Sequence, residues 1–406
     1  MPISKQKSKL LMIPHYDIHI LNQITEFMRN LHVFLSKRKD ISLFIKSIKI
    51  VLISFIIIVG FTSGALQSQE KLDWYKNASL FINIDTYPRN FDAAGLPTYR
   101  EEIKELIRRT NATMIYYHCS SQDGYTKYQS EAGIEHPSLG DQDMVRIWRE
   151  VTKEMGVKFF AYVSYHMARA ELEAHPEFRR INRQGTPIER PCSNSGYADT
   201  YLLPKVEELV TGYDIDGLWL DASIWAVTPC YCKHCMKGFE QKYGSHPPKN
   251  TNDPLWKGFA RFQRESFEKQ SKRLGVLLHK HKPECIYVPN YAFTIYQPEK
   301  VRDYVDAISG DVGHDRRTQM VSFKSRFSDT QGVPWDIMLG VRYSLTINVL
   351  DDGKFEISGP LARRKGDIEG ELQWFGVPKS AEYLSQESAI IGANGGIVSM
   401  FVHTMW

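Results

Sequence analysis

Apolar, strand-like runs alternate with charged segments of helical period along most of this chain, and this alternation constrains the fold more than any other feature. Uninterrupted apolar runs bounded by helix candidates are typical of strands in a parallel sheet that helices cover. The runs are Ser79–Asp85, Ala112–His118, Val157–Tyr165, Ile215–Asp221, Cys285–Tyr291, Asp306–Asp311, Trp335–Tyr343 and Gly395–Phe401. Eight βα units close into a (β/α)8 barrel, the TIM barrel, which is the α/β fold that we predict for residues 71–406.

The first seventy residues differ from the rest in charge and hydropathy. Basic side chains precede an uncharged stretch, Ile50–Gln69. The hydrophobic segment, about residues 43–65, has a strongly apolar part closer in length to that of a signal peptide than to the roughly 20 residues that cross a bilayer. We therefore predict that residues 1–70 are an export leader, either a cleaved signal peptide or an uncleaved transmembrane anchor. The remainder would be periplasmic or secreted, with membrane contact only through this segment.

The charge balance excludes one class of partner. The formal net charge is +4, but residues 1–70 hold nine Lys or Arg against four Asp or Glu, which leaves the predicted barrel at about −1. A barrel without a basic surplus lacks the electrostatic footprint of a nucleic-acid-binding protein. We therefore expect no nucleic-acid partner.

Polar side chains close several of the predicted strands. Asp221 ends the fourth run, His118 ends the second, Tyr165 and His166 follow the third, and Asp311 ends the sixth. Active sites of TIM barrels lie at the C-terminal ends of the strands, so these side chains are expected to converge on one mouth. For each residue alone, a structural role in capping a strand end is the alternative.

Several segments resemble a known family. They are "YYHCSSQDGYTKYQSEAGIEHPSL", "FFAYVSYHM", "CSNSGYADTYLLPKVEELVTGYDIDGLWLD" and "CYCKHCMKGFEQKYG". Together they resemble the alpha-L-fucosidase-related glycoside hydrolases, including hypothetical glycosyl hydrolase family 6. The resemblance implies that Asp221 is the nucleophile of a glycosidase. The family's Lys-x-His-Asp-Gly loop is matched only in part, by Ser120–Gly124.

Glycoside hydrolysis generally uses two carboxyl groups on either side of the scissile bond. With Asp221 as the nucleophile, the second group must stay protonated as a general acid, which needs a raised pKa. The resemblance points to the region after the sixth strand for this group. We choose Asp311, with Asp315 and Glu371 as alternatives.

Hydrogen-bonding and aromatic side chains around these carboxylates are candidates for sugar binding. Trp219 lies within a strand, and a place in the core is its alternative role. The candidates are His118, Tyr165, His166, Asn194, Trp219 and Trp225.

The cysteines form a separate motif. Cys230, Cys232 and Cys235, with Cys192 upstream, have the spacing of a tetrahedral zinc site, although an exported chain could instead pair them in disulfides. Either way we predict a structural role, with no catalytic metal and no other cofactor. Cys119 and Cys285 fall in strand-like runs and are expected to be buried thiols.

The sequence therefore predicts a retaining, alpha-L-fucosidase-like glycoside hydrolase that removes a terminal sugar from a polysaccharide or glycan. One alternative is a catalytically inactive carbohydrate-binding barrel. The cysteine cluster suggests another, a beta-galactosidase-like glycosidase.

Overall fold

The computed structural model describes residues 72–85, 100–222, 228–291, 299–313, 318–343, 346–349, 354–358, 364–367 and 377–403. All of them belong to the second of two compact units, Ser68–Trp406. The predicted leader, residues 1–70, therefore lies outside the described residues. Among the helices that are described, none combines the length and apolar character needed to cross a membrane.

The central sheet is a parallel barrel of eight strands, as the sequence predicts. In barrel order these are β10 (Ile308–Gly313), β11 (Trp335–Gly340), β17 (Ile397–His403), β1 (Leu80–Asp85), β2 (Met114–Ser120), β5 (Lys158–Ser164), β8 (Gly217–Asp221) and β9 (Ile286–Pro289). A parallel bridge between Asn290 and Ser309 connects β9 to β10. The two register irregularities within this parallel pairing, at His118/Ser120 and Asp311/Gly313, both lie toward the C-terminal ends of their strands.

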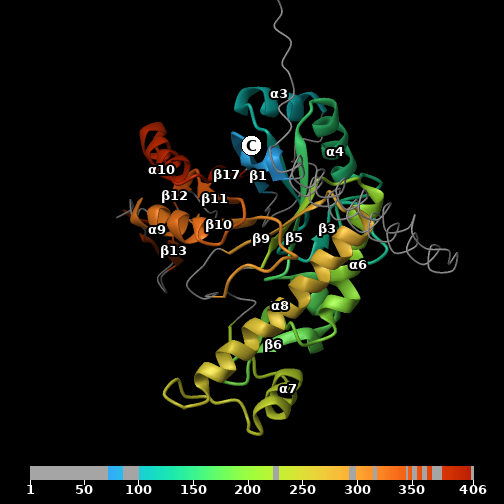
Figure 1. The fold of residues 1–406 in the computed structure, drawn as a ribbon, viewed down its shortest axis with the longest axis vertical. Helices are drawn as coiled ribbons and strands as arrows, with labels where there is room; N and C mark the ends of the chain where they lie inside the picture. Colours follow the sequence, from blue (N-terminus) through green and yellow to red (C-terminus); the bar gives the residue numbers. More distant parts are fainter. Residues whose placement is uncertain are drawn as a thin grey trace, which may run out of the picture. The chain divides into compact units, whose positions relative to one another are not determined.

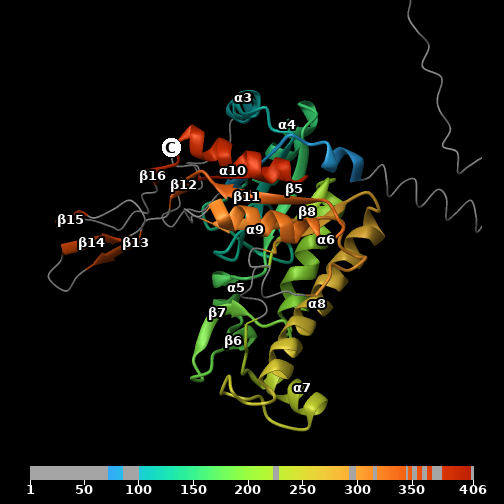
Figure 2. The same ribbon diagram turned by 60° about the vertical axis from the view of Figure 1, so that its left-hand side comes forward.

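Helices surround the barrel (Figures 1 and 2). Helix α7 (Lys233–Tyr243) lies apart from the barrel, near the outer end of α8, and the helices around the barrel are α3 (Arg100–Thr110), α4 (Met144–Glu154), α5 (Arg169–Ala174), α6 (Leu203–Gly212), α8 (Trp256–His281), α9 (Thr318–Asp329) and α10 (Ala381–Ala393). The outer strand faces pack against these helices in one large apolar core, which includes Ile115, Trp148, Leu218 and Leu274. The outer faces of the described barrel strands are therefore covered by helices.

A second core fills the barrel interior, because alternate residues of each strand point inward. It contains Phe81, Tyr116, Phe160, Tyr162 and Trp219. Deeper in the strands lies a carboxylate, that of Asp336, which is fully buried. Its Oδ1 accepts hydrogen bonds from Tyr75 (2.7 Å) and Tyr116 (3.2 Å), and its Oδ2 accepts one from Ser309 (2.9 Å). The barrel is thus a packed core rather than a pore.

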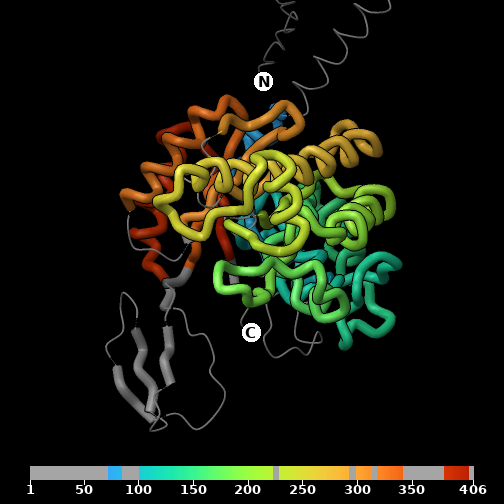
Figure 3. Tube along the Cα trace, turned by 90° about the horizontal axis from the view of Figure 1, so that it is seen from below, coloured from blue at the N-terminus to red at the C-terminus, as the bar shows by residue number. Residues whose placement is uncertain are grey.

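The loops after β5 and β8 build a lobe beside the mouth of the barrel, which we call the cysteine lobe and define as residues 179–195 and 228–266. It contains the hairpin β6 (Arg179–Ile181) and β7 (Pro187–Pro191), helix α7 and the first half of α8. Figures 1 and 2 show α8 running from the barrel out to this lobe, and Figure 3 shows the lobe in front of the barrel when it is seen from below. The sequence did not predict this lobe as a structural unit.

Three smaller groups of strands lie outside the barrel and the lobe. β3 (Tyr125–Thr126) pairs antiparallel with the end of β2 and parallel with β4 (Ile134–Glu135), and β12 (Arg342–Tyr343) pairs antiparallel with β16 (Val377–Pro378). A separate sheet of three strands consists of β13 (Thr346–Val349), β14 (Lys354–Ser358) and β15 (Arg364–Asp367). The single run predicted over Trp335–Tyr343 is therefore two strands, β11 and β12.

Candidate active site

The carboxylate of Asp221, the last residue of β8, is the centre of the polar contacts at the mouth of the barrel. Its Oδ2 accepts hydrogen bonds from Tyr162 Oη (2.5 Å) and Gln122 Nε2 (3.1 Å), and it lies 2.9 Å from His166 Nδ1. Its Oδ1 accepts one longer hydrogen bond, from Asn290 Nδ2 at 3.3 Å. Among the described residues, most of the donors therefore hold Oδ2, and Oδ1 keeps more of its capacity for another partner.

These contacts decide the charge of Asp221. Burial of the side chain, which is 6% exposed, would raise the pKa of this carboxyl group, but the imidazole of His166 and the hydrogen bonds from Tyr162 and Gln122 outweigh that effect. The pKa of Asp221 is therefore held well below its usual range. A carboxylate that stays ionised at neutral pH can act as a nucleophile but not as a general acid.

Aromatic stacking fixes Tyr162 beneath this carboxylate. The imidazole of His118 stacks on the Tyr162 ring at 3.7 Å between centroids, and the Trp219 indole lies on the opposite side at 5.1 Å. The position of His118 is fixed in turn, since its Nε2 lies 2.9 Å from Asn83 Oδ1. Because a sandwiched ring cannot turn freely, the hydroxyl of Tyr162 is pre-oriented toward Asp221.

A tight loop after β2 carries Gln122 to the site. Gly124 has a φ of +83°, and a Cβ at this position would lie 2.8 Å from backbone atoms of Ala168 and Ala170. The N–H groups of Arg169 and Ala170 donate to the carbonyl groups of Gln122 and Asp123. Only glycine fits both the backbone conformation and this close approach, so the loop is locked against the start of α5.

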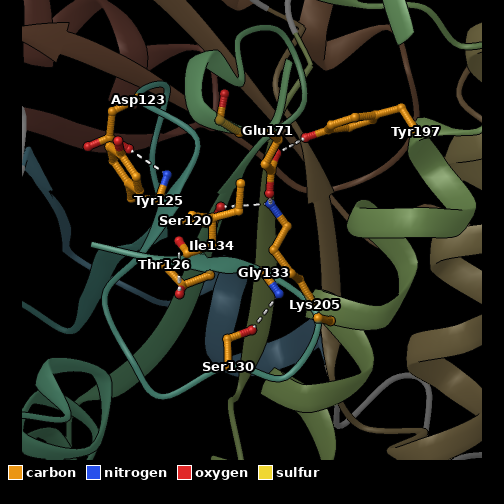
Figure 4. A network of polar contacts seen from close by, with 12 residues as sticks. Ser120, Asp123, Tyr125, Thr126, Ser130, Gly133, Ile134, Glu171, Tyr197 and Lys205 are labelled. Atoms are coloured by element: carbon orange, nitrogen blue, oxygen red, sulfur yellow. Dashed lines mark hydrogen bonds and ion pairs between the residues drawn. The ribbon is translucent and has the colours of Figure 1, made fainter. Parts of the chain in front are cut away.

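A buried ion pair supports this loop from below (Figure 4). Lys205 of α6 contacts Glu171 of α5, and both side chains are inaccessible to solvent. Lys205 Nζ also donates to Ser120 Oγ (2.9 Å) at the end of β2, and Tyr197 Oη donates to Glu171 (2.7 Å). A buried ion pair with its remaining positions hydrogen-bonded fixes geometry strongly, because loss of either partner leaves an uncompensated charge.

Asp311, the predicted second carboxyl group, lies on β10, which β9 connects to the strand of Asp221. Ser309, two residues earlier on β10, bridges to Asn290, which donates to Asp221. Because alternate residues of a strand face the same way, Asp311 also faces inward, one step closer to the mouth. Asp311 is half-buried, whereas Ser309 is fully buried. Its role as the catalytic acid remains a prediction.

The other predicted binding residues lie in different environments. His166 contacts Asp221, whereas His118 is fully buried behind Tyr162. Trp219 and Tyr165 are each 1% exposed: Trp219 lies inside the barrel, and Tyr165 packs outside it in the larger core. Neither position leaves surface for a sugar, so their predicted binding role has a packing explanation instead.

Asn194 lies in the cysteine lobe, where its side chain donates to Cys235 Sγ (3.3 Å) and Ser266 Oγ (2.9 Å). It therefore belongs to the surroundings of the cysteines. Three further candidates fall outside the described residues: Trp225, Asp315 and Glu371.

The sequence interpretation missed three residues of the site, namely Tyr162, Gln122 and Asn290. Each carried a usable signal. Tyr162 has the inward parity of β5, Asn290 directly follows the fifth barrel strand, and Gln122 occupies the histidine position of the partly matched loop. Strand parity combined with the positions of the strand ends would have identified Tyr162 and Asn290.

The four predicted cysteines do come together. Cys192, Cys230, Cys232 and Cys235 are all buried, and their Sγ atoms lie within 4.8 Å of one another. None of the chain's six cysteines is in a disulfide, and Cys119 and Cys285 are buried thiols, as predicted. The tetrad is therefore a group of sulfur ligands that a metal ion could share.

The fold, but not the sequence, is similar to known proteins. No family model matches the chain, and no curated protein matches it either. Alpha-L-fucosidase isoenzyme 2 from Paenibacillus thiaminolyticus superposes with a TM-score of 0.60 at 18% identity, over 81% of this chain and 46% of that chain.

Two beta-galactosidases superpose almost as well. The enzyme of the Antarctic haloarchaeon Halorubrum lacusprofundi gives a TM-score of 0.56 at 12% identity, over 80% of this chain and 52% of that one. The enzyme of the psychrophilic Marinomonas ef1 gives 0.56 at 11% identity, over 80% and 54%. The chain thus spans about half the length of these glycosidases and shares their barrel fold.

Proposed function

We propose that this protein is a retaining glycoside hydrolase of the alpha-L-fucosidase type, in which Asp221 attacks the anomeric carbon of a terminal sugar. The observation that carries the proposal is the set of contacts around Asp221, which keep a buried carboxylate ionised at the C-terminal end of a barrel strand. The similarity of the fold to an alpha-L-fucosidase and to beta-galactosidases supports the same reaction class.

The contacts also suggest which oxygen reacts. Oδ2 is held by Tyr162 and Gln122 and contacts His166, whereas Oδ1, among the residues that the structure describes, accepts one long hydrogen bond, from Asn290. We assign the attack to Oδ1, which forms the glycosyl ester as the leaving-group oxygen departs. The donors on Oδ2 then hold the carboxyl plane in place through both steps.

Asp311 is our choice for the acid that protonates the leaving group and later deprotonates the attacking water. Its place on β10, inward and nearer the mouth than Ser309, supports this role. Carboxyl groups of retaining glycosidases lie about 5–5.5 Å apart, so the pairing requires Asp311 to approach Asp221 that closely around the bound sugar.

A panel of nitrophenyl glycosides tests the proposal with the full-length protein. We expect release of nitrophenol from the alpha-L-fucoside and, by proton NMR, a first-formed sugar with the anomeric configuration of the substrate. Hydrolysis of the beta-galactoside alone would favour a beta-galactosidase instead. Sugar binding without turnover of any glycoside would favour an inactive carbohydrate-binding barrel.

The Asp311→Asn variant tests the second carboxyl group. An acid catalyst matters most for poor leaving groups, so the variant should lose far more activity on a natural disaccharide than on a nitrophenyl glycoside. An equal loss on both substrates would contradict the role, and Asp315 would be the next residue to test.

A further inference from the structure

The cysteine lobe has a small apolar core for a structure that projects from the barrel. Its main cluster consists of Tyr231, Phe239 and Phe259, with partly buried neighbours such as Ile181 and Phe262. The four cysteines form a second cluster beside it, again with Ile181 and Phe262. Small units of this kind usually need a cross-link, either a disulfide or a metal ion, to become stable.

The sulfur atoms have the spacing of a metal site rather than of disulfides. Cys192 Sγ lies 3.4 Å from Cys235 Sγ, 3.5 Å from Cys232 Sγ and 3.8 Å from Cys230 Sγ. A disulfide needs an S–S distance of about 2.05 Å. Four sulfurs at about 2.3 Å from a tetrahedral zinc ion are separated by roughly 3.8 Å. Cys192 is therefore close to the zinc-site distance from all three partners at once.

Hydrogen-bond donors around the sulfurs give independent support. The backbone N–H of Asn194 points to Cys192 Sγ (3.4 Å), and the side-chain amide of Asn194 donates to Cys235 Sγ (3.3 Å). N–H groups directed at sulfur favour the thiolate form and are a common outer shell of metal-bound cysteine. The tetrad therefore has both the ligands and the outer shell that a thiolate site needs.

A buried cation accompanies the tetrad. Arg180 of β6 is 1% exposed, and its guanidinium donates to the carbonyl of Thr228 and to Gln263 Oε1 (3.1 Å). Four thiolates and one divalent ion carry a net charge of −2, which is costly to bury unless positive charge lies nearby. Arg180 supplies such a charge and also joins β6 to α8 and to the chain that enters the cluster.

We propose that Cys192, Cys230, Cys232 and Cys235 bind one zinc ion as thiolates, releasing their four protons to solvent, and that this ion cross-links the loops after β5 and β8. Four thiolate ligands leave no open position for water or substrate, so the role is structural. The two loops start next to the site: His166 follows β5, and Asp221 ends β8. The zinc ion would thus hold together the two chain segments that deliver these side chains.

The test is a metal analysis of the full-length protein, purified without chelators, by inductively coupled plasma mass spectrometry. We expect about one zinc per chain, and all six cysteines should react with a thiol reagent after denaturation without reductant. Less than about 0.1 zinc per chain, a stoichiometric amount of iron, or a thiol count lowered by disulfides would overturn the proposal.

Variants locate the ion. Cys232→Ser and Cys235→Ser should lose the zinc and lower the Tm by about 10 °C or more, because metal-binding energy is folding energy in such sites. Cys119→Ser and Cys285→Ser, which replace buried thiols outside the tetrad, are matched controls and should retain the zinc. Zinc that persists in both tetrad variants would contradict the assignment.

If the tetrad variants fail to fold, the wild-type protein can still show whether the cysteines bind zinc. Titration of its thiols with a mercurial should release one zinc per chain to a chromogenic indicator, and no release would count against the site. These measurements do not depend on hydrolysis. A zinc-free but active glycosidase would overturn only this inference, whereas a zinc-loaded protein without turnover would overturn only the proposed function.

Discussion

Two aspartates inside the same barrel, Asp221 and Asp336, are both buried and both hydrogen-bonded to tyrosine, yet their pKa values move in opposite directions. Burial raises the pKa of Asp336 to about 7, and the hydroxyl groups of Tyr75, Ser309 and Tyr116 offset only part of that effect. At the mouth, the pKa of Asp221 is held well below its usual range. The main difference is the imidazole of His166, 2.9 Å from the carboxylate of Asp221.

The comparison shows that hydroxyl donors alone do not keep a carboxylate ionised in this barrel interior. The Asp336 carboxyl group has hydroxyl donors alone, whereas Asp221 has the imidazole of His166 in addition to hydrogen-bond donors, and this imidazole lowers the pKa of Asp221. The carboxyl group of Asp336, deep in the barrel, can stay protonated near neutral pH. The carboxylate at the mouth has a partner that favours the charged form, as a nucleophile requires.

Asp221→Asn is the change with the largest expected effect. An amide cannot attack the anomeric carbon, so kcat/KM should fall by about 10³-fold or more while the fold survives, since the side-chain shape is kept. Asp141→Asn, which replaces an exposed aspartate before α4, is the control and should be fully active.

The smaller Asp221→Gly variant sharpens this test. Azide should occupy the space left and restore part of the turnover of an activated substrate, giving a glycosyl azide of inverted configuration. Wild-type turnover in pure Asp221→Asn protein would refute the nucleophile assignment.

His166→Asn should have the next largest effect, because it replaces the imidazole next to Asp221 with a neutral amide. We expect kcat/KM to fall about 10²-fold and its acidic limb to move to higher pH by ~1 unit or more, as the pKa of Asp221 rises toward its usual range. The shift of the pH profile distinguishes loss of the interaction between His166 and Asp221 from a structural effect, which would lower kcat/KM without moving the acidic limb. His175→Asn replaces a half-buried histidine that also contacts a carboxylate, that of Glu177, and should leave the profile unchanged.

Asp336→Asn tests the raised pKa of Asp336 through its effect on the stability of the fold. Between about pH 4 and pH 7 the unfolded carboxyl ionises while the folded one keeps its proton, so the contribution of Asp336 to stability falls as pH rises. Asparagine preserves the shape and removes this dependence, which should raise the free energy of unfolding by up to about 4 kcal/mol at pH 8, since each pKa unit corresponds to about 1.4 kcal/mol, and by little at pH 4. Denaturant titration of both proteins at pH 4 and at pH 8 measures the free energy of unfolding. Equal effects at the two pH values would show that Asp336 titrates normally.

Tyr162→Phe should have the smallest effect. The ring remains stacked between His118 and Trp219, and the hydrogen bond from its hydroxyl group to Asp221 is lost. We expect kcat/KM to fall about 10-fold, with a smaller upward shift of the acidic limb than in His166→Asn. Tyr116→Phe removes the equivalent bond to Asp336 and should leave activity unchanged. A larger shift for Tyr162 than for His166 would mean that the hydroxyl, not the imidazole, controls Asp221.

The fold could be predicted because strand and helix periodicities are local properties of the sequence. The same holds for the position of Asp221 at a strand end, and for the cysteines, three of which lie within six consecutive residues, Cys230–Cys235. The partners of Asp221 were harder to predict, since Tyr162 and Gln122 are 59 and 99 residues away in the chain. Their contacts depend on barrel closure and on a loop conformation that only Gly124 permits.

Side-chain direction explains the remaining differences. Trp219 and Tyr165 lie on neighbouring strand segments with opposite parity, so one enters the barrel interior and the other the outer core. Asn194 was predicted to bind sugar as a hydrogen-bonding side chain in a loop near the strand ends. The loop leads instead into the lobe, whose path no short motif encodes.

Helix α8 is long enough to act as a strut. Its 26 residues span about 39 Å at 1.5 Å per residue, and it is anchored along its length. Phe259 packs in the lobe, Gln270 donates to the carbonyl of Ser193, and Leu274 and Leu278 pack in the barrel core. A continuous helix fastened at both ends offers no hinge, so the lobe and the barrel wall should move as one body during turnover. Substrate entry and product departure would then be controlled by loops at the rim, and amide hydrogen exchange along α8 should be uniformly slow.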